Sequence, residues 1–141
     1  MIRISNKILS DIAGRVKLHY PKAECVGIYT QSPSNFPHVC VIEESNTTYT
    51  RSQSETGRER HAEISYTVNI YSDAEKQKKE ECYSIAEIVD EYFQDVGFTR
   101  VSFDSVPNID KSIYRLAMRY RAVVSVGKEE DGEMRYYIYR K

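Results

Sequence analysis

The chain has 141 residues, a length that favours a single domain over residues 1–141 with a sizeable buried core. Its 20 basic and 21 acidic side chains give a net charge of -1, so the overall charge of the chain does not favour electrostatic attraction to nucleic acid. The 3 cysteines have no close spacing and indicate neither a disulfide framework nor a zinc knuckle, and no apolar run approaches the length of a membrane span. We therefore expect buried thiols in a protein made in a reducing cytoplasm, with no membrane partner.

The N-terminal third predicts one helix and two strands. Apolar residues recur at three- and four-residue steps from Ile4 to Val16 and predict an amphipathic helix. This helix should end before Pro21, because the residue before a proline disfavours helical geometry. A short strand is expected over 25–30. The unbroken apolar run within 37–44 then predicts a strand that is covered on both faces or lies at a subunit contact.

Residues 45–60 form a long polar segment with almost nothing to bury, so the segment cannot offset the entropy of being ordered alone. Two interpretations stay open. It is either a β-hairpin with a flexible tip or an arm that becomes ordered only against a partner. The side chains that an arm would offer to a partner are Tyr49, Arg51, Arg58 and Arg60.

The stretch 61–98 predicts a strand followed by one long helix. Residues 61–71 alternate between apolar and polar, as a half-buried strand requires. Ser72 and Glu75 have the spacing of a capping box, and Gly97 suits the left-handed residue that ends a helix. A helix of about two dozen residues would be roughly 35 Å long. Its expected apolar stripe is Cys82, Ile85, Ala86, Val89, Tyr92, Phe93 and Val96.

Three further strands are expected after the helix. The first covers 98–106, with Phe98, Val101 and Phe103 as its buried anchors. Residues 112–126 alternate along their whole length, and a charged turn over 127–132 leads into a strand over 134–140 that pairs with the one before it. The outward face of the alternating strand carries Arg115, Arg119 and Arg121.

Together these elements predict an α+β fold in two layers. A mainly antiparallel sheet packs the long helix on one face, with the N-terminal helix beside it. The opposite face of the sheet is left partly polar and carries the arginines.

No set of side chains has the spacing of a catalytic or metal site. His19, His38 and His61 lie on different predicted elements, where surface or edge-strand positions are expected. The sequence has no glycine-rich phosphate loop and no nucleophile elbow around a serine or cysteine. We therefore expect a protein that is not an enzyme and needs no cofactor or metal.

Acidic side chains near the end of the long helix oppose the negative end of its dipole. They are Glu87, Asp90, Glu91 and Asp95. One interpretation is that these acids face positive groups on a neighbouring copy, and the three arginines of the alternating strand are a plausible match. Exposed ion pairs contribute only about 0–1 kcal/mol each, so they would determine how neighbouring copies align but would not hold an assembly together. The alternative is that both groups are ordinary solvated side chains.

Five segments carry a resemblance to a known family. They are Tyr20-Pro21, Phe36 to Glu44, Tyr66 to Ser72, Val96 to Arg100, and Pro107-Asn108 followed by Ile113 to Tyr120. In this order and spacing they resemble the tail-terminator proteins of long-tailed phages. That family is also described as tail-completion, tail-to-head joining or minor capsid proteins.

The resemblance implies a structural subunit that closes into a ring, commonly a hexamer, at the head-proximal end of a phage or phage-tail-like particle. Such a ring caps the tail-tube protein, stops tube growth and meets the head-tail connector protein. DNA would pass through its channel without specific binding. The implied location is the neck of a virion assembled in a bacterial cytoplasm, with either a contractile or a non-contractile tail.

A small nucleic-acid-binding domain is the alternative function, with Arg115, Arg119 and Arg121 as its binding strand. Proteins that bind single strands interleave stacking rings and charges on one surface. In this sequence the alternation places Tyr114 and Tyr120 on the face opposite the arginines, which argues against the alternative.

Overall fold

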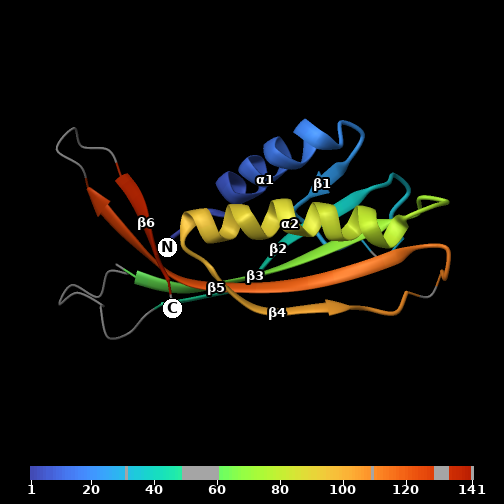
Figure 1. Cartoon of the computed structure of the whole chain (residues 1–141). Coiled ribbons are helices and arrows are strands. Elements are labelled where there is room, and N and C mark those ends of the chain that lie inside the picture. The colour runs from blue at the N-terminus through green and yellow to red at the C-terminus, as the bar shows by residue number, and fades with distance from the viewer. Residues whose placement is uncertain (31, 49–60, 109, 129–133, 141) are drawn as a thin grey trace.

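A computed structural model describes residues 1–30, 32–48, 61–108, 110–128 and 134–140, with the backbone alone for 126–128 and 134–140. Within these residues the chain forms two helices and six strands (Figure 1). They are α1 (Ser5–His19), β1 (Glu24–Val26), β2 (His38–Thr48), β3 (His61–Ser72), α2 (Lys78–Val96), β4 (Thr99–Ser105), β5 (Tyr114–Lys128) and β6 (Met134–Arg140). The predicted α+β fold is confirmed.

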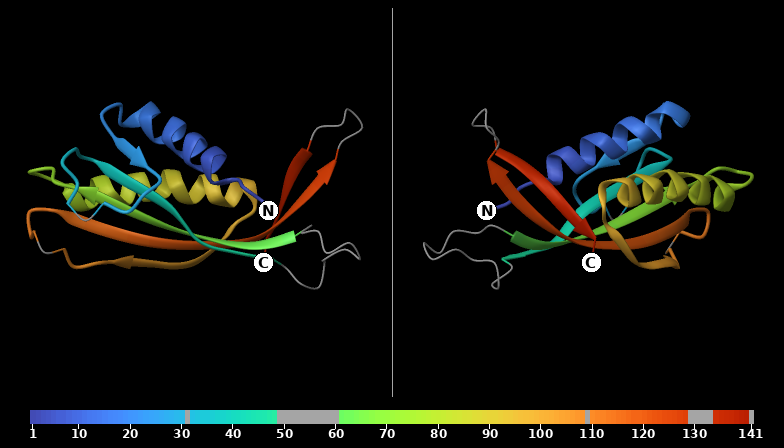
Figure 2. Two further views of the ribbon diagram at one scale, coloured as in Figure 1. Left: turned by 180° about the vertical axis from the view of Figure 1, so that it is seen from behind. Right: turned by 60° about the vertical axis from the view of Figure 1, so that its left-hand side comes forward.

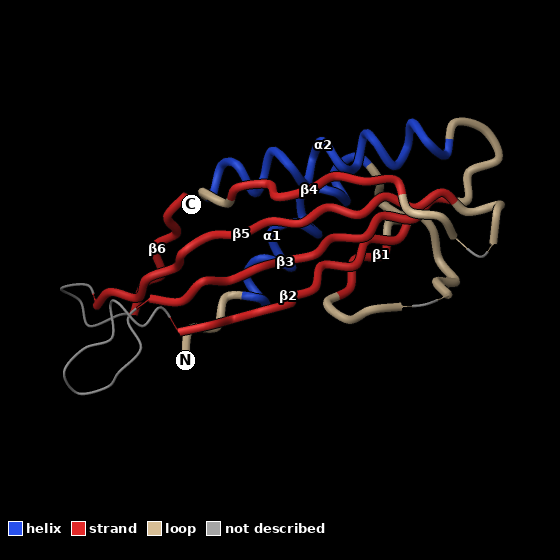
Figure 3. The backbone as a smooth tube through the Cα atoms, turned by 90° about the horizontal axis from the view of Figure 1, so that it is seen from below, coloured by secondary structure: helices blue, strands red, loops and turns tan. Residues whose placement is uncertain are grey.

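The sheet is built around β5, its longest strand at 15 residues. The strand order is β1-β2-β3-β5-β4, and every pairing is antiparallel except that of β1 with β2. The remaining strand, β6, pairs with the far half of β5. Consequently β4 and β6 follow one another along the same edge of β5, and β3 occupies the other edge (Figure 3).

Both helices lie on the same face of the sheet (Figure 2). α2 packs against β3 and β5, while α1 packs against α2 and the β1–β2 edge. Phe93 of α2 lies at the centre of this layer, fully buried, with its ring stacked on Tyr120 of β5 at 4.1 Å between centroids. Tyr66 of β3 and Phe98 close the same aromatic cluster. The face that carries the helices is called the inner face below, and the opposite face is the outer face.

α2 begins later than the capping-box spacing predicts. Ser72 is the last residue of β3 and pairs with Tyr114 of β5, so strand pairing overrides the local helix signal. The helix starts at Lys78, after Gln77 in the left-handed region at φ 61°, and has 19 residues, which is roughly 28 Å. The hydroxyl of Ser72 still contacts the helix, since it donates to Oε1 of Glu81 at 2.9 Å.

The end of α2 is as predicted. Gly97 has φ 103°, a backbone geometry that side chains with a Cβ rarely adopt. Its N–H reaches the carbonyl oxygens of Phe93 and Gln94, and the N–H of Phe98 donates to that of Phe93 at 2.8 Å. The helix therefore closes on a glycine, and Phe98 is turned directly into the core.

Three expectations for the strands need correction. β1 is limited to Glu24–Val26 and does not continue to residue 30. β2 extends through Thr48, so the first four residues of the polar segment 45–60 pair with β3 as one side of a β-hairpin. On β4, Val101 lies at a break in register and is 53% exposed, so it is no core anchor, whereas Phe103 packs against the core.

Candidate interaction surfaces

Neither helix covers the outer face of the sheet (Figures 1 and 2). β-sheet register places Arg115, Arg119 and Arg121 there, opposite Tyr71, Thr67 and Ser65 of β3. The sequence therefore predicted the face of these arginines correctly. It did not predict how differently the three guanidinium groups are engaged.

Arg115 is held in place by β3. Its Nε and Nη2 atoms both donate to Oδ1 of Asn69, at 3.1 and 2.9 Å, and Asn69 is itself buried. The guanidinium carbon lies 5.4 Å from the ring centroid of Tyr71 and 6.0 Å from that of Tyr29. Hydrogen bonding and ring contacts thus fix the direction of this arginine before any partner arrives.

The other two arginines are exposed. Arg121 forms a long ion pair with Glu63 at 3.6 Å, a contact that solvent weakens because both side chains are partly exposed. Arg119, in the middle of the outer face, has no hydrogen-bond or ion-pair partner among the residues that the structure describes. Arg119 is thus the cation on this face that is most available to another molecule.

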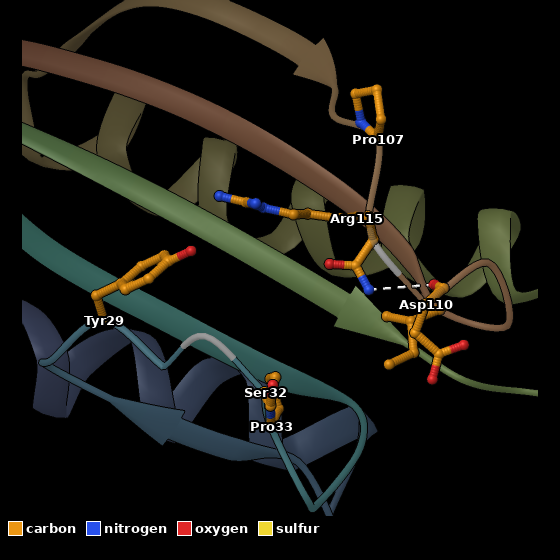
Figure 4. Close-up of a pocket in the computed structure, with 8 residues that line it drawn as sticks. Tyr29, Ser32, Pro33, Pro107, Asp110 and Arg115 are labelled. Atoms are coloured by element: carbon orange, nitrogen blue, oxygen red, sulfur yellow. Dashed lines mark hydrogen bonds between the residues drawn. The ribbon is translucent and has the colours of Figure 1, made fainter.

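A pocket of about 290 Å³ lies at the end of the outer face, between the segment after β1 and the segment before β5 (Figure 4). Its lining residues are Tyr29, Ser32, Pro33, Pro107, Asn108, Asp110, Ile113 and Arg115. Arg115 reaches across β3 toward Tyr29, while Asp110 lies at the other end of the pocket. The Asp110 carboxylate accepts hydrogen bonds from the N–H and hydroxyl of Ser112, which hold the pKa of this exposed group below its usual value.

Two of the four acids on α2 have partners inside the chain, which corrects the idea that they need a positive group from outside. Asp90, whose side chain is only 18% exposed, accepts from the Tyr120 hydroxyl at 2.7 Å and pairs with Arg100 at 3.3 Å. Asp95 pairs with Arg15 of α1 at 3.0 Å. Sequence spacing could not show these pairs, because each partner lies on another element.

Glu87 and Glu91 remain the free acids of this set. Both are exposed on α2, one helical turn apart, on the side that faces away from the sheet. Neither has a hydrogen-bond or ion-pair partner within the described ranges. Exposed Glu80 lies seven residues, or about two helical turns, before Glu87, so α2 presents to solvent a line of carboxylates that are unpaired within the described part of the chain.

The tyrosines of β5 are turned away from the arginines. Tyr120 is fully buried on the inner face, and Tyr114 packs half-buried against the same core. The rings of β5 are therefore not interleaved with its arginines, and the rings that lie beside an arginine on the outer face, Tyr29 and Tyr71 at Arg115, come from other segments.

The expectation of a surface or edge-strand position is wrong for His38, which is buried on β2, a strand that lies between β1 and β3. Its side chain is 1% exposed, neither ring nitrogen has a hydrogen-bond partner among the residues that the structure describes, and its ring meets that of Tyr71 edge-on at 5.9 Å between centroids. Burial lowers its pKa, and the Glu24 carboxylate acts in the opposite direction. The only sequence signal was its position at the start of an apolar strand, directly after Pro37.

Within the described ranges, no three His, Cys, Asp or Glu side chains gather closely enough to hold a metal ion. Neither helix in this part of the chain combines the length and the apolarity that crossing a membrane requires. The cysteines are free, and burial raises the pKa of the Cys82 thiol to about 12, so this thiol is unsuited to nucleophilic chemistry.

The partner-binding residues predicted for the polar segment are Tyr49, Arg51, Arg58 and Arg60, and all four lie outside the described residues. The two strands that flank them, β2 and β3, pair as neighbours in the sheet. A comparison with models of known protein families finds no match, and a comparison with curated proteins finds no significant relative.

Proposed function

We propose that the chain is a non-enzymatic assembly subunit that associates with copies of itself through opposite sides of the molecule. One observation carries the proposal. Within the described residues, Glu87 and Glu91 have no partner on the solvent side of α2 and Arg119 has none on the outer face of the sheet, and the two-layer core lies between them. Each molecule thus offers unpaired carboxylates on the helix side and an unpaired guanidinium group on the sheet side.

This arrangement favours a head-to-tail contact. If the acidic side of one copy meets the basic side of the next, the interface joins two different surfaces. Such contacts form a ring when the rotation between copies closes, and a filament when it does not. A contact between two identical surfaces would instead bring like charges together.

The ion pairs between copies would determine how neighbouring copies align more than how tightly they bind. Exposed ion pairs stabilise by about 0–1 kcal/mol each, and salt screens them. The main contact area would come from the outer face of the sheet, where Ser65 and Thr67 of β3 pair with Arg121 and Arg119 and Ala117 of β5 lies between Arg115 and Arg119.

The biological setting of the proposal comes from the sequence resemblance to phage tail terminators. In that setting the ring lies at the head-proximal end of a phage or phage-tail-like tail, caps the tail-tube protein and meets the head-tail connector protein. DNA would cross its channel without specific binding, and assembly would take place in a bacterial cytoplasm. A compact α+β subunit with two chemically different sides is compatible with this role.

Light scattering and negative-stain images of the purified chain test the proposal. We expect closed rings whose population falls as salt rises from about 0.05 M to about 0.5 M, because the register charges are screened. Addition of the tail-tube protein should produce tubes with the ring at one end only. A chain that stays monomeric at every concentration, with and without tube protein, would contradict the proposal.

A further inference from the structure

The pocket at the end of the outer face has the features of a receptor site for a carboxylate. Arg115 lines it, and two of the five guanidinium N–H groups already donate to Asn69. Because the bonds to Asn69 use Nε and Nη2, the end of the guanidinium formed by Nη1 and the second Nη2 hydrogen stays available. That end, called the fork below, presents two parallel N–H donors, which is the geometry that binds both oxygens of a carboxylate.

No acid among the described residues occupies this fork. In the part of the chain that the structure describes, Arg115 has no carboxylate within ion-pair distance. Asp110 lines the same pocket, but its carboxylate is engaged by Ser112 and points away from Arg115 (Figure 4). A half-buried, oriented arginine that lacks an acidic partner leaves room for an acid from another molecule.

The surroundings of the fork favour a peptide over a small molecule. The volume of about 290 Å³ is at the lower limit of ligand pockets and suits a side chain better than a cofactor. Tyr29, which lines the pocket, is 55% exposed, and the preceding Ile28 is 73% exposed, so the segment after β1 presents two large apolar side chains to solvent. Tyrosine and arginine are the residues most enriched at the centres of protein interfaces.

We propose that this pocket binds an acidic peptide segment of a partner protein, with the carboxylate on the Arg115 fork and a neighbouring apolar side chain against Ile28 and Tyr29. The inference does not depend on ring formation. Arg115 pairs with Tyr71 at the end of β3, four strand positions from Arg119, which is roughly 13 Å along β5. A nucleic-acid phosphate is disfavoured, because the pocket holds a single arginine and has Asp110 at its other end.

Ligand-observed NMR on the full chain tests the proposal, since it detects weak binding to a monomer and to a ring alike. The probe is the capped tripeptide acetyl-Leu-Asp-Leu-amide, and the matched control is acetyl-Leu-Asn-Leu-amide, which has the same shape without the charge. We expect saturable binding of the acidic peptide with a dissociation constant on the order of millimolar. The control peptide should bind about tenfold more weakly.

Three variants locate the site. Arg115→Gln removes the fork and Tyr29→Ala removes the exposed ring, so each should weaken binding of the acidic peptide, the first by about tenfold or more. Arg119→Gln removes an equally charged group from the same face outside the pocket and should leave binding unchanged. If Arg115→Gln disturbs the fold, as circular dichroism would show, Tyr29→Ala decides the question, because Tyr29 lies on an exposed segment.

Three outcomes would overturn the proposal. They are equal binding of the two peptides, undiminished binding in both pocket variants, and tighter binding of a decathymidine single strand at the same site. A chain that fails to form rings but binds the acidic peptide would remove the ring proposal and leave this one standing.

Discussion

Tyr92 of α2 donates its hydroxyl to Oδ2 of Asp11 of α1 at 2.8 Å, across 81 positions of sequence. Its ring is buried, so the side chain joins the core at one end and a charged group at the other. Tyr120 reaches Asp90 in the same way at 2.7 Å, and Tyr66 reaches Glu43 at 3.3 Å. Burial, reinforced by each carboxylate, raises the pKa of these three tyrosines well above the usual value.

Removing the Tyr92 hydroxyl tests whether this pattern stabilises the helix layer. We expect Tyr92→Phe to lower the free energy of unfolding by about 1–2 kcal/mol, since a hydrogen bond to a charged acceptor is lost while the ring stays buried. Urea unfolding measures the change. The control is Tyr83→Phe, whose hydroxyl has no partner in the part of the chain that the structure describes and whose effect should stay within about 0.5 kcal/mol. Equal effects of the two changes would contradict the interpretation.

The two glycines of the helix layer should respond to alanine with opposite signs. Gly97→Ala places a Cβ on a residue at φ 103° and should destabilise the protein by about 1–2 kcal/mol. Gly14→Ala lies within α1, and among the described residues no atom beyond the adjoining helix backbone and chain neighbours would lie within 4 Å of the new Cβ, so the change should stabilise the protein by about 0.5–1 kcal/mol. Thermal or urea unfolding of both variants checks the pair. A stabilising effect at Gly97 would show that the helix does not end on a left-handed residue.

The buried imidazole of His38 should make stability depend on pH. Burial lowers its pKa in the folded chain below the ordinary value of 6.5, so the unfolded chain takes up a proton first as pH falls. Stability is then fully present above about pH 6.5 and decreases as pH falls from there toward the lower folded pKa. Asp11, whose pKa is also lowered, acts in the same direction but only in the more acidic range of carboxylates.

Urea unfolding at several values between about pH 8 and about pH 5 measures this dependence. His38→Phe should flatten the profile in that interval, because the replacement cannot take up a proton. His19→Gln is the control, since His19 is exposed at the end of α1. An unchanged profile in His38→Phe, or a flattened one in His19→Gln, would assign the dependence to another group.

The spacing of apolar residues predicted correctly which faces of β5 and α2 are buried, and the reason is geometric. Alternation over 112–126 fixes which face of β5 each residue occupies, so the burial of Tyr120 and the exposure of Arg119 followed directly. The helical stripe likewise predicted that Phe93 would be buried. Where two local signals competed, as at Ser72, the pairing with β5 decided the outcome, and a single sequence does not carry that information.

The engagement of individual charges was beyond such reasoning. Asp90 and Glu91 are neighbours in sequence, yet Asp90 is engaged by Tyr120 and Arg100 while Glu91 is free. Arg115 depends on Asn69, 46 positions away, and the register of β3 on β5 brings the two together. The sequence identified the charged side chains. Only the three-dimensional structure separates those that are engaged by other residues of the chain from those that can contact another molecule.

Two charge-reversed chains provide the most direct test of head-to-tail association. One carries Glu87→Lys and Glu91→Lys, so both of its sides are basic. The other carries Arg119→Glu, so both of its sides are acidic. Circular dichroism should show that each variant keeps the fold, because the altered side chains are exposed.

Light scattering of the two variants, alone and mixed in equal amounts, is the deciding measurement. Each variant alone should assemble less than the natural chain, because like charges now meet at every contact. The mixture should recover assembly, since alternating copies restore opposite charges at each junction. Variants that assemble normally alone, or a mixture that stays as dissociated as its components, would contradict the proposed contact between the α2 acids and the outer face of the sheet.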